Sequence, residues 1–79
     1  MATYKYSQFI KFSDHAAFDA ITPVGSAAPY SGIYRCEGCG HEIVSTYGNT
    51  MPPQNHPQHS IAQGAIRWRL IVSHEPKPI

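Results

Sequence analysis

Apolar and polar residues alternate in two stretches of the chain, and this alternation predicts β-strands because successive strand side chains point to opposite faces. Residues 3–12 are rich in aromatic residues, and most of their apolar side chains share one parity, with the lysines on the other. Residues 66–72 show the clearest pattern, in which apolar residues alternate with two arginines. We expect Trp68 in the core, because it shares the parity of the other apolar residues of this stretch. Those residues are Ile66, Leu70 and Val72.

The segments between these two stretches predict a hairpin, a short helix and a loop. Residues 32–36 and 42–47 are rich in strand-forming residues and flank a tight turn, so they are predicted as the two strands of the hairpin. Residues 13–21 predict a short helix or a single turn, with Ser13 as its N-cap. Proline, glycine and small residues from 22 to 31 predict an irregular connection.

Length and composition limit the class of protein. The chain has 79 residues, which allows one domain. A domain of this size buries only about 60 % of the surface of its unfolded chain, so it often depends on a disulfide or a metal ion. Two cysteines are too few for the disulfide framework of a secreted domain. The net charge is +1 and only 14 % of residues are charged, so the basic stripe typical of nucleic-acid binding is not seen.

The sequence shows no pattern of a membrane-targeted segment. The first residues lack the apolar centre of a signal peptide. No stretch approaches the roughly 20 apolar residues that a transmembrane helix needs. We therefore expect a cytoplasmic protein with no membrane partner.

Two pairs of potential metal ligands recur at the same spacing. Cys36 and Cys39 are separated by two residues, and so are His56 and His59. Zinc prefers four sulfur or nitrogen ligands in a tetrahedron, and two ligands that flank two turn residues can reach one ion without strain. Gly40 suits the chain that leaves the first turn, because glycine adopts a positive φ at little cost. The sequence therefore predicts one Zn²⁺ held by these two cysteines and two histidines.

Other readings of the same residues are weaker. Cys36 and Cys39 could form a redox pair, but the βαβ pattern that surrounds thioredoxin-like cysteines is missing. A catalytic zinc usually keeps three protein ligands and an open position, whereas four good ligands favour a closed structural site. His41 lies too close to Cys39 to replace a ligand without distorting the turn, and we expect it at the surface or beside the site.

The motifs resemble a known group of proteins. The segment Tyr-Arg-Cys-x-x-Cys-Gly over residues 34–40, the prolines at 52 and 53, the second ligand pair and Trp68 are similar to the zinc-ribbon and rubredoxin-like group. Residues 31–36 are also similar to small bacterial zinc-ribbon proteins of unassigned role. The resemblance covers about residues 30 to 70. It departs at the second pair, where the group has two cysteines and a glycine and this chain has two histidines and Ser60. A Cys2His2 set argues against the iron electron transfer of rubredoxins, which uses four thiolates.

These patterns predict the fold class. We expect a small, mainly β, metal-stabilised domain: a zinc ribbon of the rubredoxin-like type with an extra N-terminal strand and one short helix. A single domain would span residues 1–79. Residues 1–30 would hold the N-terminal strand, helix and loop, residues 31–73 the zinc ribbon, and residues 74–79 a frayed tail.

The same patterns predict a binding function rather than an enzymatic one. We expect a structural zinc protein that acts as a non-catalytic interaction module for a protein partner. The first alternative is binding of single-stranded nucleic acid, and the second is a metal-dependent or redox enzyme. We expect a monomer or a weak homodimer, in which residues 66–72 could serve as an edge strand. The basic and aromatic residues proposed for an interaction surface are Arg35, Arg67, Arg69 and Tyr34.

Overall fold

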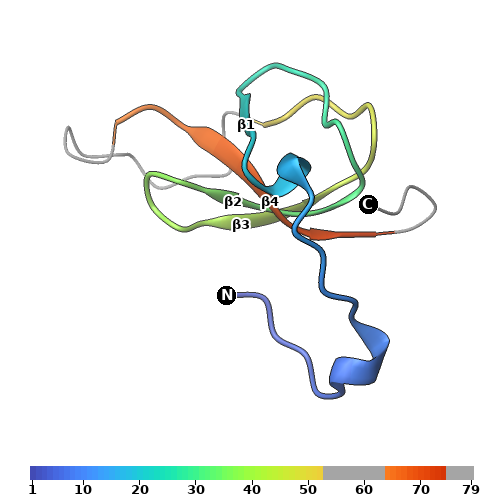
Figure 1. Cartoon of the computed structure of the whole chain (residues 1–79). Helices are drawn as coiled ribbons and strands as arrows, with labels where there is room; N and C mark the ends of the chain where they lie inside the picture. The colour runs from blue at the N-terminus through green and yellow to red at the C-terminus, as the bar shows by residue number, and fades with distance from the viewer. Residues whose placement is uncertain (53–63, 75–79) are drawn as a thin grey trace.

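A four-stranded antiparallel sheet forms the centre of the molecule (Figure 1). The computed structural model describes residues 1–52 and 64–74. The strands follow the order β1-β4-β2-β3 across the sheet. Their bounds are Ile21–Pro23 for β1, Gly32–Cys36 for β2, Glu42–Ser45 for β3 and Arg67–Ser73 for β4. The only helical elements of the described ranges are two 3₁₀ turns, η1 (Ser7–Phe9) and η2 (Ala16–Phe18), and neither is long enough to cross a bilayer.

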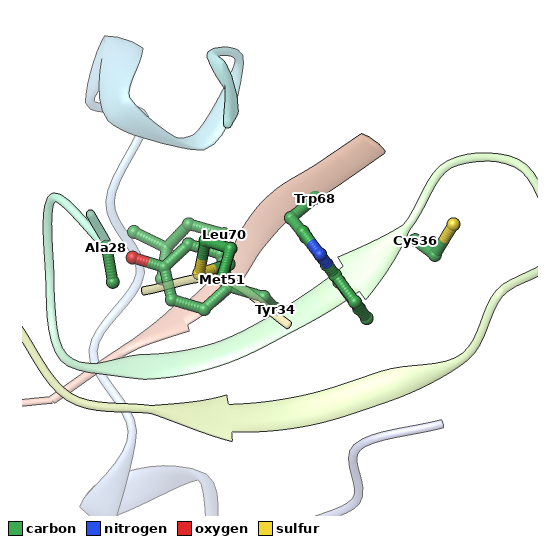
Figure 2. Close-up of a cluster of buried hydrophobic side chains, with 6 residues drawn as sticks. All are labelled: Ala28, Tyr34, Cys36, Met51, Trp68 and Leu70. Atoms are coloured by element: carbon green, nitrogen blue, oxygen red, sulfur yellow. The ribbon is translucent and has the colours of Figure 1, made fainter. Parts of the chain in front are cut away.

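The core lies on one face of the sheet. Tyr34 and Cys36 of β2 are fully buried beside Trp68 and Leu70 of β4, because the register places Tyr34 opposite Leu70 and Cys36 opposite Trp68 (Figure 2). The side chain of Met51 covers this group and is itself fully buried. The expectation that Trp68 and Leu70 belong to the core is confirmed.

Two loops run side by side above this core. The N–H group of Gly25 donates to the Met51 carbonyl oxygen at 3.1 Å, and the Met51 N–H group donates to the Ser26 carbonyl oxygen at 2.9 Å. The Ala28 N–H group donates to the Asn49 carbonyl oxygen at 2.8 Å. The loops therefore satisfy each other's backbone groups while they deliver Met51 to the core.

A β-bulge in β4 reverses the alternation of this strand. Ile33 lies opposite Val72 and Tyr34 lies opposite Leu70, so Ile71 is an extra residue between two successive pairs. An extra residue shifts every following side chain to the other face. Val72 therefore lies on the same face as Ile33, and the prediction that it shares the core face with Trp68 is wrong.

The hairpin strands were located well by the sequence. The strand over residues 32–36 is confirmed, and β3 begins at residue 42 as expected but ends at Ser45. β4 is shifted by one residue from the expected 66–72. It lies between β1 and β2, so it is not an edge strand.

The N-terminal third differs from the expectation. The strand predicted for residues 3–12 does not form; the segment contains η1, and no described strand pairs with it. Alternation specifies a strand only where a neighbouring strand accepts its hydrogen bonds. Of the two outcomes predicted for residues 13–21, a short helix or a single turn, the structure shows the single turn η2. Its N-cap is His15 rather than the predicted Ser13, because the His15 Nδ1 atom accepts a hydrogen bond from the Ala17 N–H group at 3.0 Å. β1 lies where the sequence predicted the helix end and an irregular loop.

Candidate metal centre at the β2–β3 turn

The turn between β2 and β3 carries both cysteines. Cys36 ends β2, and Cys39 lies in the turn before β3 begins. Two hydrogen bonds close the turn: the Gly40 N–H group donates to the Cys36 carbonyl oxygen, and the Cys36 N–H group donates to the His41 carbonyl oxygen, both at 2.8 Å. The structure therefore holds the two thiol-bearing residues in one closed turn.

Gly40 has the backbone conformation that the sequence predicted for it. Its φ is 80°, in the left-handed region that residues with a side chain rarely adopt. A methyl group at this position would also lie 3.1 Å from a guanidinium nitrogen of Arg35. Glycine thus allows both the exit of the chain from the turn and the close approach of Arg35.

The surroundings of Cys36 favour its thiolate form. Burial raises the pKa of the Cys36 thiol, but hydrogen bonds from the backbones of Arg67, Cys39 and Gly38 and from the Cys39 side chain lower it, and the net pKa is below the ordinary value. Hydrogen bonds to the charged form of a group stabilise that form. Both cysteines are free thiols rather than a disulfide. Cysteine binds a metal ion as the thiolate, and the hydrogen bonds to the buried sulfur of Cys36 stabilise this form.

Strand β4 holds the turn in place from the side. The Glu37 N–H group donates to the Arg67 carbonyl oxygen at 2.8 Å. The backbone of Arg67 also forms a hydrogen bond with the sulfur of Cys36, which lowers the pKa of this thiol. The first residue of β4 therefore contacts two successive residues of the turn. This contact joins parts of the chain that are distant in sequence.

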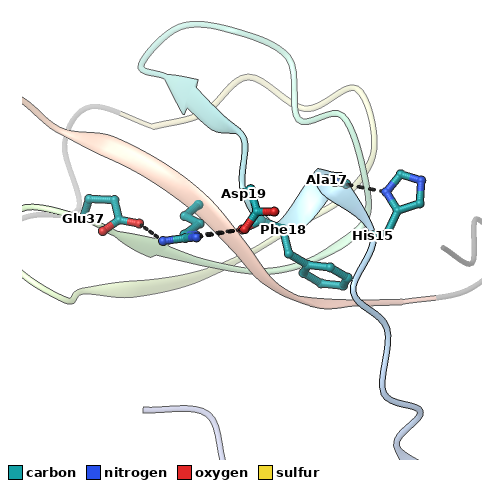
Figure 3. Close-up of polar contacts among 6 residues, drawn as sticks. His15, Ala17, Phe18, Asp19 and Glu37 are labelled. Atoms are coloured by element: carbon teal, nitrogen blue, oxygen red, sulfur yellow. Dashed lines mark hydrogen bonds and ion pairs between the residues drawn. The ribbon is translucent and has the colours of Figure 1, made fainter.

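Arg69 adds a second link through its side chain (Figure 3). Its guanidinium contacts the Glu37 carboxylate at 3.0 Å and the Asp19 carboxylate at 3.2 Å, and its Nε donates to the Phe18 carbonyl oxygen at 2.7 Å. Glu37 raises the pKa of Arg69, and Asp19 raises it further. The cysteine turn and η2 are thus tied to the same side chain.

The four predicted ligands are placed differently with respect to the described residues. Cys36 and Cys39 lie in one turn, as described. His56 and His59 lie in the segment 53–63, outside the described residues, so their ligation stays a prediction. Within residues 1–52 and 64–74, the structure shows no group of three or more histidine, cysteine or acidic side chains able to hold an ion. His41 is half-buried beside the turn.

The residues predicted for an interaction surface do not all lie on one face of the sheet: Arg35 and Arg69 are opposite each other, and Tyr34 is on the core face. Tyr34 is fully buried, and its hydroxyl donates to the Tyr30 carbonyl oxygen at 2.6 Å, so it belongs to the core rather than to a surface. Arg69 is engaged with Glu37 and Asp19. Arg35 is exposed, and Arg67 is half-buried.

Sequence reasoning missed the partners of Arg69. Glu37 stands between the two cysteines, and no pattern within the sequence pairs it with Arg69. The opposite charges of Glu37 and Arg69 were visible in the sequence, but only the strand register brings them together.

Comparison with known proteins identifies one relative. The chain is 45 % identical over 75 residues to Protein L of Escherichia coli, and the alignment covers 95 % of this chain and 84 % of that protein. The chain belongs to the family of Protein L. No family model matches the chain, and no solved structure matches it. The name Protein L states no activity, so the functional argument rests on the chemistry of the turn and on the surfaces around it.

Proposed function

We propose that this member of the Protein L family is a structural zinc protein that serves as a non-catalytic interaction module. One Zn²⁺ would be held by Cys36 and Cys39 as thiolates and by His56 and His59 as neutral imidazoles. The observation that carries the proposal is the ring of hydrogen-bond donors around the sulfur of Cys36, inside a turn closed at Gly40.

The chemistry of the turn suits zinc in two respects. Thiolates must form before they bind the ion, and the donors around Cys36 already favour the charged sulfur. Two thiolates also cancel the charge of Zn²⁺, so the occupied site would be neutral. A neutral site can lie against the buried Trp68, which is opposite Cys36 in the sheet, without a large desolvation cost.

The need for a metal also follows from the size of the core. In the described part of the chain, six residues form the buried apolar cluster, and small domains with a small core often depend on additional links such as a metal ion. Structural zinc contributes on the order of 10 kcal/mol in small domains, which is comparable with the whole net stability of a domain. A structural role for the ion is therefore sufficient to explain why the cysteine turn is built as it is.

The interaction role rests on exposed apolar side chains. Val44 is 79 % exposed on β3, and Phe9 and Phe12 of the N-terminal segment are 74 % and 86 % exposed. Apolar side chains gathered on one side of a small protein mark a binding surface. An aliphatic and aromatic surface of this kind favours a protein partner.

Metal analysis of matched histidine variants tests the proposal. We expect one zinc ion per chain in the purified protein, and loss of most of it in His56→Ala and in His59→Ala. His15→Ala, His41→Ala and His74→Ala are the controls and should keep their zinc. Zinc retained when both His56 and His59 are replaced would refute the ligand set.

A second measurement addresses the structural role of the ion. Substitution with Co²⁺ gives an absorption spectrum that distinguishes four protein ligands from a site with a bound water. A closed four-ligand spectrum is expected. An open position, or a Cys36–Cys39 disulfide that forms reversibly with glutathione, would instead favour the enzyme alternatives.

A further inference from the structure

The face of the sheet opposite the core is apolar at the end away from the cysteine turn, and this end is only partly covered. Ile33 of β2 lies opposite Val44 of β3 and Val72 of β4, so these three side chains share this face, which we call the outer face. The N-terminal segment passes on this side of the sheet, while the paired loops lie on the other (Figure 1). Between the segment and the outer face runs a groove of about 1230 Å³, whose lining includes Phe9, Phe12 and the three residues of the outer face.

One side of the groove ends at β3, which among the described residues has a neighbouring strand, β2, on one side only. The Cys36 N–H group bonds the His41 carbonyl oxygen, and hydrogen-bonded pairs alternate along an antiparallel ladder. The backbone groups of Ile43 therefore face β2, and those of Glu42 and Val44 face outward at the edge. An incoming strand would find a backbone to pair with and an exposed valine beside it.

The groove carries positive charge. Lys11 lines it together with Arg69, whose charge is offset by Asp19 and Glu37, and Arg35 lines its continuation beneath the first residues of the chain. Glu42 is the one acidic residue among the described residues that line either part, and it pairs with the N-terminal amine at 3.2 Å. Residues 1–12 contain two lysines and no acid. The charges around the groove therefore favour an anionic occupant.

We propose that the groove and the free edge of β3 bind an extended acidic segment of the protein partner. This inference rests on the interaction role proposed above and specifies its surface. The segment would add a strand beside β3 through Glu42 and Val44, a common mode of peptide recognition. Successive side chains of an added strand point to opposite faces of the sheet, so both kinds of contact would come from every second residue of the segment. Of these outward residues, the apolar ones would lie beside Val44 and the acidic ones would meet Lys11 and Arg35.

Two other occupants fit less well. A second copy would bring the same positively charged groove to the contact, and like charges oppose association. Single-stranded nucleic acid is bound through many phosphate contacts and through stacking on aromatic rings. The floor of this groove is aliphatic, at Ile33, Val44 and Val72. Phe9 and Phe12 line its other side, but the cations Lys11 and Arg35 are too few to follow a chain of phosphates.

The test uses the zinc-loaded full chain and four probes of similar length. The first is a synthetic octapeptide whose odd positions are alternately valine and glutamate and whose even positions are serine. The others change one property each: lysine in place of glutamate reverses the charge, serine in place of valine removes the apolar side chains, and octathymidylate replaces the peptide. Binding is followed by changes in the amide NMR signals of ¹⁵N-labelled protein at constant salt.

The valine–glutamate peptide should shift the signals of Glu42, Val44 and the outer face, and the other three probes should shift them much less. Val44→Asp should weaken this binding by about tenfold, because it removes an apolar contact and adds a negative charge. Lys11→Glu should also weaken it. Ile21→Asp is the matched control, since Ile21 is an exposed aliphatic residue of β1 at the opposite edge of the sheet. The Ile21→Asp variant should bind the valine–glutamate peptide as tightly as the wild type does.

Several outcomes would overturn the inference. Equal shifts with the lysine peptide would remove the charge argument, and stronger binding of octathymidylate at this face would assign it to nucleic acid. Self-association that Val44→Asp abolishes would assign the edge to a second copy. Peptide signals elsewhere on the chain, or none with one zinc ion bound, would reject this surface and leave the zinc site standing. A chain that takes up no zinc fails the proposed function itself, whatever the peptide does.

Discussion

The guanidinium of Arg69 lies 3.0 Å from the carboxylate of Glu37 and so ties the central strand β4 to the turn that carries both cysteines. The same side chain reaches Asp19 and the carbonyl oxygen of Phe18. Arg69 is partly exposed, so each ion pair by itself contributes little to stability. The guanidinium is planar and its donors point in fixed directions, so a single side chain of β4 holds η2 and the cysteine turn in a defined arrangement.

Replacement of Arg69 should loosen this junction. We expect Arg69→Lys to lower the melting temperature by a few degrees, because a single ammonium cannot reproduce the three contacts of the guanidinium. Arg67→Lys is the matched control, because the contacts of Arg67 to the turn come from its backbone. Thermal unfolding followed by circular dichroism measures the effect. Equal melting temperatures for the wild type and Arg69→Lys would show that the junction is not stabilising.

Gly40 and Gly48 provide a matched pair for testing the cysteine turn. Both have a φ in the left-handed region, 80° and 86°. Alanine at either position should cost about 1–2 kcal/mol of folding free energy through backbone strain. Only Gly40→Ala meets a neighbour, since Arg35 lies 3.1 Å from the added methyl group, whereas nothing lies within 4 Å at Gly48. We therefore expect both variants to lose stability in urea and only Gly40→Ala to lose zinc affinity in a chelator competition. A loss of zinc affinity of the same size in Gly48→Ala would contradict this.

The zinc content should depend on pH. Histidine and cysteine bind zinc only after they lose their protons, so protons compete with the ion. If His56 and His59 are ligands, zinc should be released as the pH falls below about 6.5, the ordinary pKa of histidine. Dialysis at a series of pH values followed by elemental analysis measures the release. Zinc content that stays constant between neutral and mildly acidic buffer would count against histidine ligation.

Tyr34 should make the fold sensitive to alkaline pH. Burial raises the pKa of its phenol above the ordinary value of 10.0, and the hydrogen bond with the Tyr30 backbone opposes this only in part. Because the folded pKa is the higher one, the stabilising effect of the neutral phenol is complete below pH 10 and is lost as the pH rises through the folded pKa.

Tyr34→Phe isolates this contribution. At neutral pH the variant should lose about 1 kcal/mol, since the hydroxyl both donates to and accepts from the Tyr30 backbone. Above pH 10 the difference in unfolding free energy between the variant and the wild type should shrink. Only the wild type has the buried phenol, whose stabilising effect is lost as the pH rises through its folded pKa. Urea unfolding at pH 7 and pH 11 measures both effects, with Tyr4→Phe as an exposed control. A constant difference at the two pH values would contradict the argument.

The sequence determined the local parts of this protein. The alternating residues around Trp68, the strands that flank the cysteine turn and the positive φ of Gly40 all follow from patterns within a few residues, because side-chain period and turn chemistry are local properties. The ligand spacing of the two cysteines belongs to the same class. The pairing of these cysteines with His56 and His59 stays a prediction from spacing.

Only the tertiary structure decided how these parts meet. The bulge at Ile71 turned Val72 to the outer face, and β4 became a central strand between β1 and β2. The segment 3–12 forms no strand, and within residues 1–52 and 64–74 no strand lies beside it to accept its hydrogen bonds. The contact of Arg69 with Glu37 depends on the same strand register. A strand pairs with segments that are far apart from it in the chain, and the alternation of apolar and polar residues within one segment does not specify which of them becomes its neighbour.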